Sequence, residues 1–377
     1  MPVTRSACLG APCGSAGQLT RVFAPSCRDV VEHRISVFRN AVRVSSSGRP
    51  ARGSRFRRAL TASVALLGVL AAGAGPAVAQ ETIGRRFFSD TLVIPEPFVE
   101  DELSLPTVLH IRRPGSETFP RARITDITGE LKKRLTPTLE LSVGGGLTYF
   151  EPDGASTSTR FDNLDLGLKY QYFASEAHEA VLSAFMGWEV GGTGQHAPGT
   201  ESFGVLNPAL LFGKGLGDLP DPAAWLKPLA VTGVLGALVP TRASTHQTRS
   251  ETGELELPPE RHPNRLQWGV VLEYSVPYLQ AHVRDLHLPW MMTRLVPLTE
   301  IDLQTDLDRG SAGRSTGTVN PGLVWAGETV QVGVEAVCPV NRRTGKTMGV
   351  RAFVRIDLDA VLPGLGRPLF GGRPSPQ

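Results

Sequence analysis

Residues 138–150 read TLELSVGGGLTYF, and this stretch decides the fold. Leu, Val or Tyr stands at nearly every second position from Leu139 to Tyr149, whereas Thr, Glu, Ser and Gly stand between them. Successive side chains of a β-strand point to opposite faces, so this order produces one apolar and one polar face. Such a strand fits a soluble sandwich, and it also fits a membrane barrel in which one face meets lipid and the other lines the lumen.

Composition and periodicity predict many more strands of this kind. The 377 residues include 41 Gly and 30 Pro, only 20% are charged, and the mean hydropathy is −0.06, which suits strands joined by turns. The same alternation recurs in 164–172, 266–275 and 350–359, at about the length that crosses a bilayer when tilted. About twelve strands are expected, at residues 107–113, 121–134, 138–150, 161–173, 180–191, 202–215, 226–239, 265–280, 292–306, 316–326, 329–340 and 346–361.

The only long apolar run of the chain is Ala59 to Ala74. Arginines precede it and the small-residue sequence Ala77-Val78-Ala79 follows it, so residues 55–79 are predicted to be a signal peptide, with cleavage between Ala79 and Gln80. A single membrane anchor is the alternative, although the run is short for a span. Export is therefore expected.

About fifty residues precede this signal peptide, which is unusual. Residues 1–54 are rich in Arg and Ser and carry three of the four cysteines. One interpretation is a start codon assigned too far upstream, with translation beginning near Val42 or Val44; the other is a transit peptide. Cleavage would remove 11 Arg and 2 acidic residues, leaving 28 basic and 34 acidic residues, a net charge of −6 and Cys338 alone. Nucleic-acid binding and an intramolecular disulfide are therefore not expected.

Connection lengths indicate how the strands would be oriented. Outer-membrane barrels keep long loops outside and short turns, with both termini, in the periplasm. Counting 107–113 as a strand makes the number even and satisfies that rule. Two connections, 216–225 and 281–291, are long for periplasmic turns. The long connections are 151–160, 192–201, 240–264 and 307–315, and the short ones are 135–137, 174–179 and 327–328.

The predicted organisation of the exported chain has three parts. Residues 80–106 contain Pro95, Pro97 and Pro106, which argue against a helix or a regular strand, so this part is expected to be a periplasmic lead-in or a plug inside the lumen. Residues 107–370 would form the barrel, and 371–377 a C-terminal tail.

Two segments and the last strand carry a resemblance to a known group. The sequence GLKYQYF at 167–173 and the Gly-rich hairpin at 129–150 resemble those of bacterial outer-membrane β-barrels of the transporter and phenol-degradation meta-pathway type. Residues 347–354, TMGVRAFV, are similar to the signal that such proteins present to the barrel-assembly machinery, although this chain continues beyond Leu369-Phe370. The resemblance covers about 107–370 and implies an outer-membrane location.

Catalytic motifs are missing from the sequence. It contains no H-E-x-x-H, C-x-x-C or P-loop pattern, so an enzyme, a cofactor and a metal site are not expected. His282 and His287 flank Arg284 and Asp285 in a connection, and a polar turn explains them better than a metal site without a third ligand.

The polar parity of the strands predicts a charged lumen. Both signs of charge occur on it, so it would be either a water-filled conduit or a set of ion pairs that holds a narrow barrel shut. The predicted lumen-lining residues are Glu140, Lys169, Gln171, Glu189, Glu273, Glu300, Asp302, Gln331, Glu335, Arg351, Arg355 and Asp357.

Three functions remain open from the sequence. The favoured hypothesis is a passive channel for small solutes, hydrophobic ones included, surrounded by outer-membrane lipid. The alternatives are a structural or adhesion barrel that uses the 240–264 loop, and a secreted soluble β-domain that binds a ligand. The solute and the oligomeric state are left undetermined.

Overall fold

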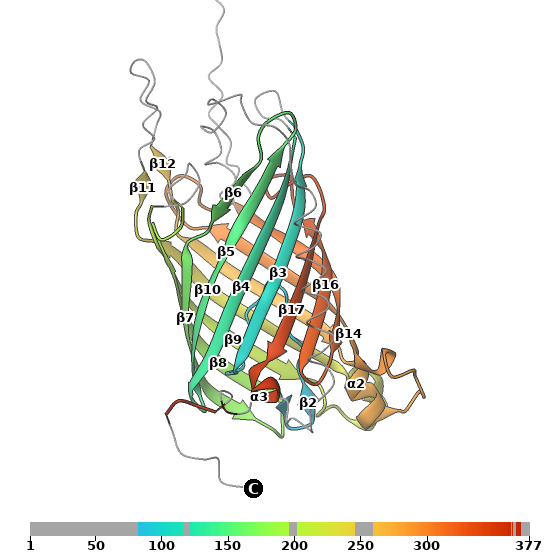
Figure 1. The fold of residues 1–377 in the computed structure, drawn as a ribbon. Coiled ribbons are helices and arrows are strands. Elements are labelled where there is room, and N and C mark those ends of the chain that lie inside the picture. The colour runs from blue at the N-terminus through green and yellow to red at the C-terminus, as the bar shows by residue number, and fades with distance from the viewer. Residues whose placement is uncertain are drawn as a thin grey trace, which may run out of the picture.

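The computed structural model describes residues 82–115, 121–195, 202–245, 259–362, 364 and 367–370. The predicted N-terminal extension, signal peptide and cleavage site lie outside these residues, as do the tail at 371–377 and residues 246–258 of the longest loop. Within the described residues the fold is one antiparallel barrel with short helices at one end (Figure 1).

Twelve long strands form the barrel wall, with the short β6 continuing the line of β7 along β5. Each strand pairs with its neighbours in the chain, and β3 pairs with β17 to close the sheet. This confirms the predicted all-β barrel of about twelve antiparallel strands. The strands are β3 (Glu102–Arg113), β4 (Ala122–Thr136), β5 (Leu139–Pro152), β6 (Ser158–Phe161), β7 (Leu164–Ser175), β8 (Ala180–Val190), β9 (Val205–Gly215), β10 (Leu229–Pro240), β13 (Arg265–Tyr274), β14 (Leu295–Asp306), β15 (Ser315–Ala326), β16 (Val330–Pro339) and β17 (Gly349–Asp357).

The remaining elements are short. Two small hairpins stand apart from the wall, β1 (Thr82–Ile83) with β2 (Arg86–Phe87), and β11 (Ser244–Thr245) with β12 (Glu260–Arg261). The helical turns are η2 (Asp221–Leu226), α2 (Val276–Tyr278), η3 (Leu279–Val283), η4 (Met292–Arg294) and α3 (Leu358–Val361). No helix among the described residues has the length and apolar character needed to cross a membrane.

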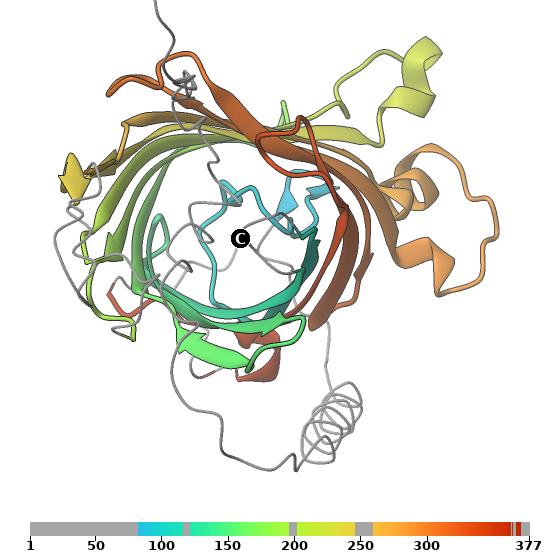
Figure 2. The same ribbon diagram turned by 90° about the horizontal axis from the view of Figure 1, so that it is seen from above.

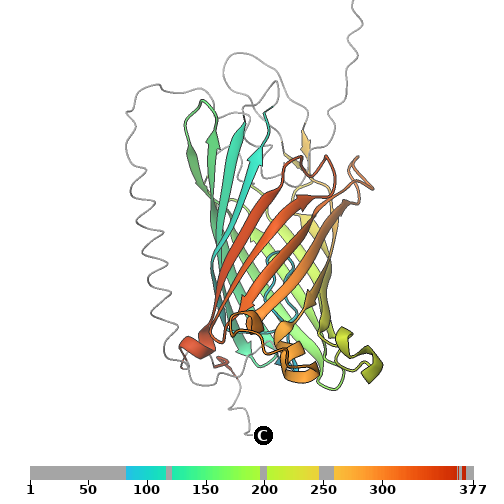
Figure 3. The same ribbon diagram turned by 90° about the vertical axis from the view of Figure 1, so that its right-hand side faces the viewer.

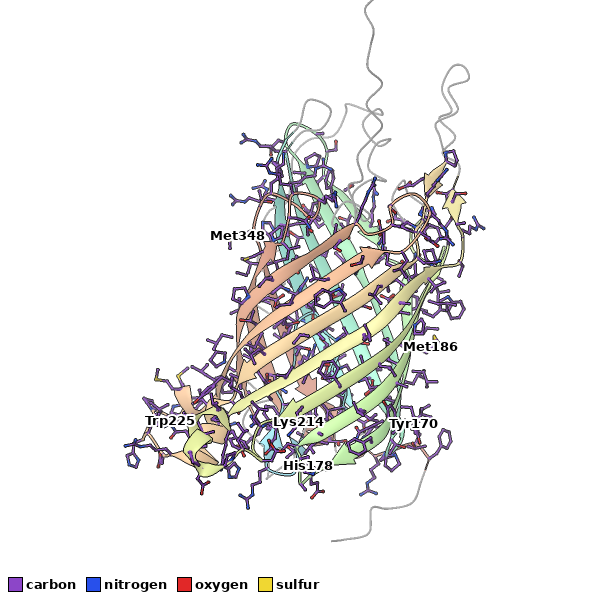
Figure 4. The ribbon with its side chains drawn as sticks, turned by 180° about the vertical axis from the view of Figure 1, so that it is seen from behind. Tyr170, His178, Met186, Lys214, Trp225 and Met348 are labelled. Atoms are coloured by element: carbon purple, nitrogen blue, oxygen red, sulfur yellow. The ribbon has the colours of Figure 1, made fainter. Side chains whose placement is uncertain are left out.

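The two faces of the wall differ in polarity as the strand alternation requires. Leu168 on β7, Leu272 on β13 and Val350 on β17 point outward and are 43%, 49% and 52% exposed. Met186 and Tyr170, seen from behind in Figure 4, lie on the same outer surface. Because a closed sheet satisfies its own backbone hydrogen bonds, this apolar exterior suits a lipid bilayer.

The predicted bounds of several strands were wrong. Strand β3 begins at Glu102 and not at 107, and it includes Pro106. Helical turns replace the ends of four other predicted strands, and β14 starts at Leu295 because η4 occupies Met292–Arg294. Strand β13 stops at Tyr274, where Ser275 accepts a hydrogen bond from the backbone N–H of Tyr278 and begins α2. Strand β17 stops at Asp357, whose carboxylate caps α3. Strand β10 starts at Leu229, after η2. Side-chain caps of this kind stabilise helix N-termini.

A lysine at Leu168 should cost about 2–4 kcal/mol of folding free energy, because it would place a charge in the hydrocarbon layer. Leu168 lies between Leu141 and Met186 on the neighbouring strands, both of them exposed on the outer face. Urea unfolding in phospholipid vesicles measures the loss. The control is Gln171→Lys on the same strand but on the lumen parity, and equal losses would mean that the two faces have been exchanged.

Candidate functional site: the lumen and the segment inside it

Residues 82–101, here called the lumen segment, run inside the barrel before β3 begins. Figure 2 looks down the barrel and shows this blue N-terminal part within the ring of strands. The segment starts at the end of the barrel that carries α2 and α3, which Figures 1 and 3 show at the bottom. That end has most of the short connections, so it corresponds to the periplasmic end of outer-membrane barrels.

Glu300 on β14 holds the tip of the lumen segment. Its carboxylate accepts hydrogen bonds from three successive backbone N–H groups, those of Leu92, Val93 and Ile94, the latter two at 2.9 and 3.0 Å. Glu300 is fully buried. Backbone donors that are not part of a sheet need another partner inside a protein, and here one wall carboxylate serves three of them.

Four other wall side chains hold the irregular backbone in the same way. Each comes from a different strand, so the segment is fixed around the circumference of the lumen. The contacts are Glu273 with the Ser89 N–H and hydroxyl (3.1 and 2.7 Å), Gln331 with the Asp90 N–H (3.2 Å), Glu140 with the Glu100 N–H (2.9 Å), and the Lys169 ammonium with the Phe98 carbonyl (2.6 Å).

A buried lysine on β4 joins the segment to the wall by charge. The Nζ atom of Lys132 lies 3.1 Å from Glu96, 2.6 Å from Glu100 and 3.3 Å from Glu102. All four side chains are about 95% buried. Buried charges are tolerated only when paired, and removal of one partner is strongly destabilising.

Arg355 on β17 forms a second buried ionic contact. Its guanidinium bonds the carboxylates of Asp90 and Glu96 and donates to the carbonyl of Thr91. Thr91 also donates its backbone N–H and its hydroxyl to Glu96, at 2.8 and 2.7 Å, which closes the tip into a compact loop. The tip is therefore a folded unit.

An apolar cluster lies in the lumen beside these charged groups. Leu92 and Ile94 of the tip belong to a buried cluster with inward-facing side chains of the wall. Burial of apolar area contributes roughly 25 cal/mol per Å². The apolar cluster therefore stabilises the docked segment in addition to the hydrogen bonds. The wall members are Ala209, Leu211, Val234, Val271, Val296, Leu298, Val324, Ala326 and Phe353.

A cavity of about 500 Å³ remains between the tip and the opposite wall. The tip presents Leu92, Val93 and Ile94 to it, and Phe185 adds an aromatic ring. The strands contribute polar and charged side chains, including Glu130, Asp165 and Glu189. The cavity is thus bounded by an apolar floor and by a wall that carries both acidic and basic side chains, the basic ones being Lys132, Lys169 and Arg355.

The residues predicted to line the lumen are found in three kinds of environment. Glu140, Lys169, Glu273, Glu300, Gln331 and Arg355 bind the lumen segment directly. Arg351 pairs with Glu335 at 2.6 Å and Glu189 accepts from Asn163 at 2.9 Å, contacts within the wall. Gln171 and Asp302 are half-buried, and Asp357 caps α3 at the periplasmic mouth.

Sequence reasoning missed Lys132 and the inward-facing apolar residues. Lys132 stands in a Lys-Lys-Arg run, which reads as a solvated turn, although it shares the parity of Glu130. Val271 and Val324 stand on the polar parity of their strands and are fully buried. A valine on the polar parity of a strand was the available signal that an apolar group fills this part of the lumen.

One ionic contact at the periplasmic mouth responds to pH near neutrality. Arg134 bonds Asp101 at 2.8 Å and Asp359 on α3 at 2.6 Å. Burial raises the pKa of the Asp359 carboxyl to about 6, with the Arg134 guanidinium opposing that rise and Asp101 adding to it. The end of the lumen segment and α3 thus share one arginine.

Among the described residues, His282 and His287 do not belong to a group of three side chains that could bind a metal ion. His282 stacks edge-on to Tyr278, and His287 lies 3.2 Å from Asp285. In the part of the chain that the structure describes, the one group of three possible ligands is Asp90, Glu100 and Glu102, and Lys132 and Arg355 already contact these carboxylates.

The closed twelve-stranded antiparallel wall, its apolar exterior and its charged interior define the fold class: the described residues form a β-barrel of the membrane-spanning type. No protein-family model and no curated protein matches the sequence. Among solved structures, the barrel is similar to the KdgM porin (TM-score 0.37, 9% identity, 67% of this chain and 98% of that one) and the NanC porin (0.39, 9%, 67% and 98%). It is also similar to an outer membrane channel from Pseudomonas putida F1 (0.43, 14%, 68% and 95%). The phenol-degradation type remains a prediction.

Proposed function

We propose that this protein is a passive channel that lets small solutes cross the outer membrane between the lumen segment and the barrel wall. The observation that carries the proposal is the cavity of about 500 Å³ beside the segment tip. Polar and charged side chains on its wall permit water and ions to enter, as in other barrel lumens.

The composition of the cavity supports solutes that have an apolar part. Leu92, Val93, Ile94, Phe185 and Leu238 contribute apolar side chains to its lining. A solute with an aromatic or aliphatic group would bury that group against this floor, while the charged wall keeps the opposite side hydrated. Small amphipathic molecules therefore fit better than large sugars.

A structural barrel without transport is the second candidate. The apolar cluster and the ion pairs of Lys132 and Arg355 fill much of the lower lumen, and a static plug would be built in the same way. The 240–264 loop assigned to adhesion lies partly outside the described residues.

Electrical recording from planar bilayers distinguishes the two candidates. The channel hypothesis predicts stepwise conductance from purified protein and swelling of vesicles in a small amphipathic solute, with less swelling in a disaccharide. Protein that inserts and keeps a heat-dependent gel mobility, but shows neither conductance nor swelling, would identify a structural barrel.

A further inference from the structure

Two long periplasmic connections lie side by side on one flank of the barrel. The first, 216–228, joins β9 to β10 and contains η2; the second, 275–294, joins β13 to β14 and contains α2, η3 and η4. Strands β10 and β13 are paired, so the two connections leave neighbouring positions of the rim. Figure 2 shows both projecting away from the barrel on the same side. We call them together the periplasmic shelf.

The shelf exposes an unusual amount of apolar side chain. Trp225 is 51% exposed, Trp290 67% and Met291 58%, and Leu226, Leu286 and Met292 are also exposed. Trp225 lies at the outer edge of the shelf in Figure 4. Periplasmic turns facing only water would not require this concentration of large apolar groups. The shelf must therefore be covered by something apolar.

Buried contacts hold the shelf in shape. Arg86 of the lumen segment donates to the carbonyls of Lys227 and Pro228 in the first connection, the latter at 2.7 Å. Its guanidinium also lies 4.0 Å from the ring centroid of Tyr278 in the second connection. The Tyr274 hydroxyl adds a hydrogen bond to the Trp225 carbonyl at 3.3 Å. The exposed groups are consequently presented on a preformed surface.

The apolar surface of the shelf continues the lipid-facing wall. Trp290 meets Trp325 of β15 edge-on, with ring centroids 6.5 Å apart. Trp325 shares its parity with Leu323, which is exposed on the outer face, and it pairs across the sheet with Leu295. The apolar surface of the shelf is therefore continuous with the lipid-facing surface of the wall. We expect both surfaces to contact the same bilayer.

We propose that the periplasmic shelf inserts into the headgroup region of the periplasmic leaflet and binds phospholipid. Tryptophan favours this region because its ring is apolar and its N–H remains hydrated, and methionine adapts to disordered chains. The shelf would then fix the depth of the barrel on one flank.

Depth-dependent fluorescence quenching tests the proposal. The chain has five tryptophans, so a variant that keeps Trp290 and replaces the others by phenylalanine reports on the shelf alone. It is reconstituted in vesicles of phosphatidylethanolamine and phosphatidylglycerol with bromine placed either high or low on the acyl chains. We expect the bromine placed high on the acyl chains to quench Trp290 more strongly than the bromine placed low. We also expect aqueous iodide to quench Trp290 at least severalfold less than a tryptophan fully exposed to water.

A matched variant that keeps only Trp268, exposed on the outer wall at β13, should be quenched more by the low bromine. If the single-tryptophan protein loses its heat-dependent mobility, Met291→Cys in a Cys338→Ser background carries a fluorophore to the same place. Quenching of the shelf probe by iodide but not by either bromolipid would overturn the proposal and would identify a surface for a periplasmic protein.

Discussion

Replacement of Glu300 by alanine is expected to release the tip of the lumen segment and to raise the single-channel conductance severalfold. The carboxylate of Glu300 accepts the N–H groups of Leu92, Val93 and Ile94. Each buried donor left without a partner costs about 1–3 kcal/mol, so the three together cost roughly 3–9 kcal/mol. Water can satisfy these donors only if the tip moves into the open lumen.

The measurement pairs conductance with a readout that does not depend on transport. A cysteine at Val93, in a Cys338→Ser background, should react with a soluble thiol reagent many times faster in the Glu300→Ala protein. The control is Glu130→Ala, which also removes a glutamate from the cavity wall but no hydrogen bond to the tip among the described residues. Unchanged thiol reactivity after Glu300→Ala would show that the segment does not depend on this anchor.

Replacement of Arg86 by methionine should lower the free energy of unfolding by about 3–5 kcal/mol, the usual loss when one partner of a buried ion pair is removed. Arg86 is fully buried, and its Nε lies 3.2 Å from the carboxylate of Glu179, which is 5% exposed. The substitution would leave that carboxylate and the carbonyls of Lys227 and Pro228 without their shared donor. Methionine keeps the apolar volume beneath Tyr278.

Arg85→Met provides the matched control, because Arg85 is adjacent in sequence but exposed. Urea titration in vesicles, followed by the heat-dependent mobility of the folded barrel, gives both free energies. The double variant Arg86→Met, Glu179→Gln should recover part of the loss, since it removes the unpaired charge. An equal loss in both single variants would exclude a specific role for Arg86.

These two positions illustrate how differently sequence patterns inform different parts of the site. Glu300 was predicted to line the lumen because it stands on the polar parity of a strand with a clear two-residue period. Its partners were not predictable, since residues 92–94 have no periodicity and their backbone N–H groups carry no sequence signal. Arg86 lies in the stretch 80–106, for which the sequence predicted no regular strand, and its sequence context gave no indication of its burial.

The sequence by itself determined the strands and their two faces: alternation along 138–150 and its counterparts specified which side chains share a face, and loop lengths predicted an even number of strands. Closure of β3 on β17 then decided for a barrel over a sandwich. Local periodicity suffices there because each strand pairs with its neighbour in the chain. Only the tertiary structure decided which inward charges meet and what fills the lumen. Arg355 and Asp90 are 265 residues apart in the chain, and Glu300 and Leu92 are 208 apart. Their contact depends on the register of the closed barrel and on the path of a segment without regular structure, so no local pattern encodes it.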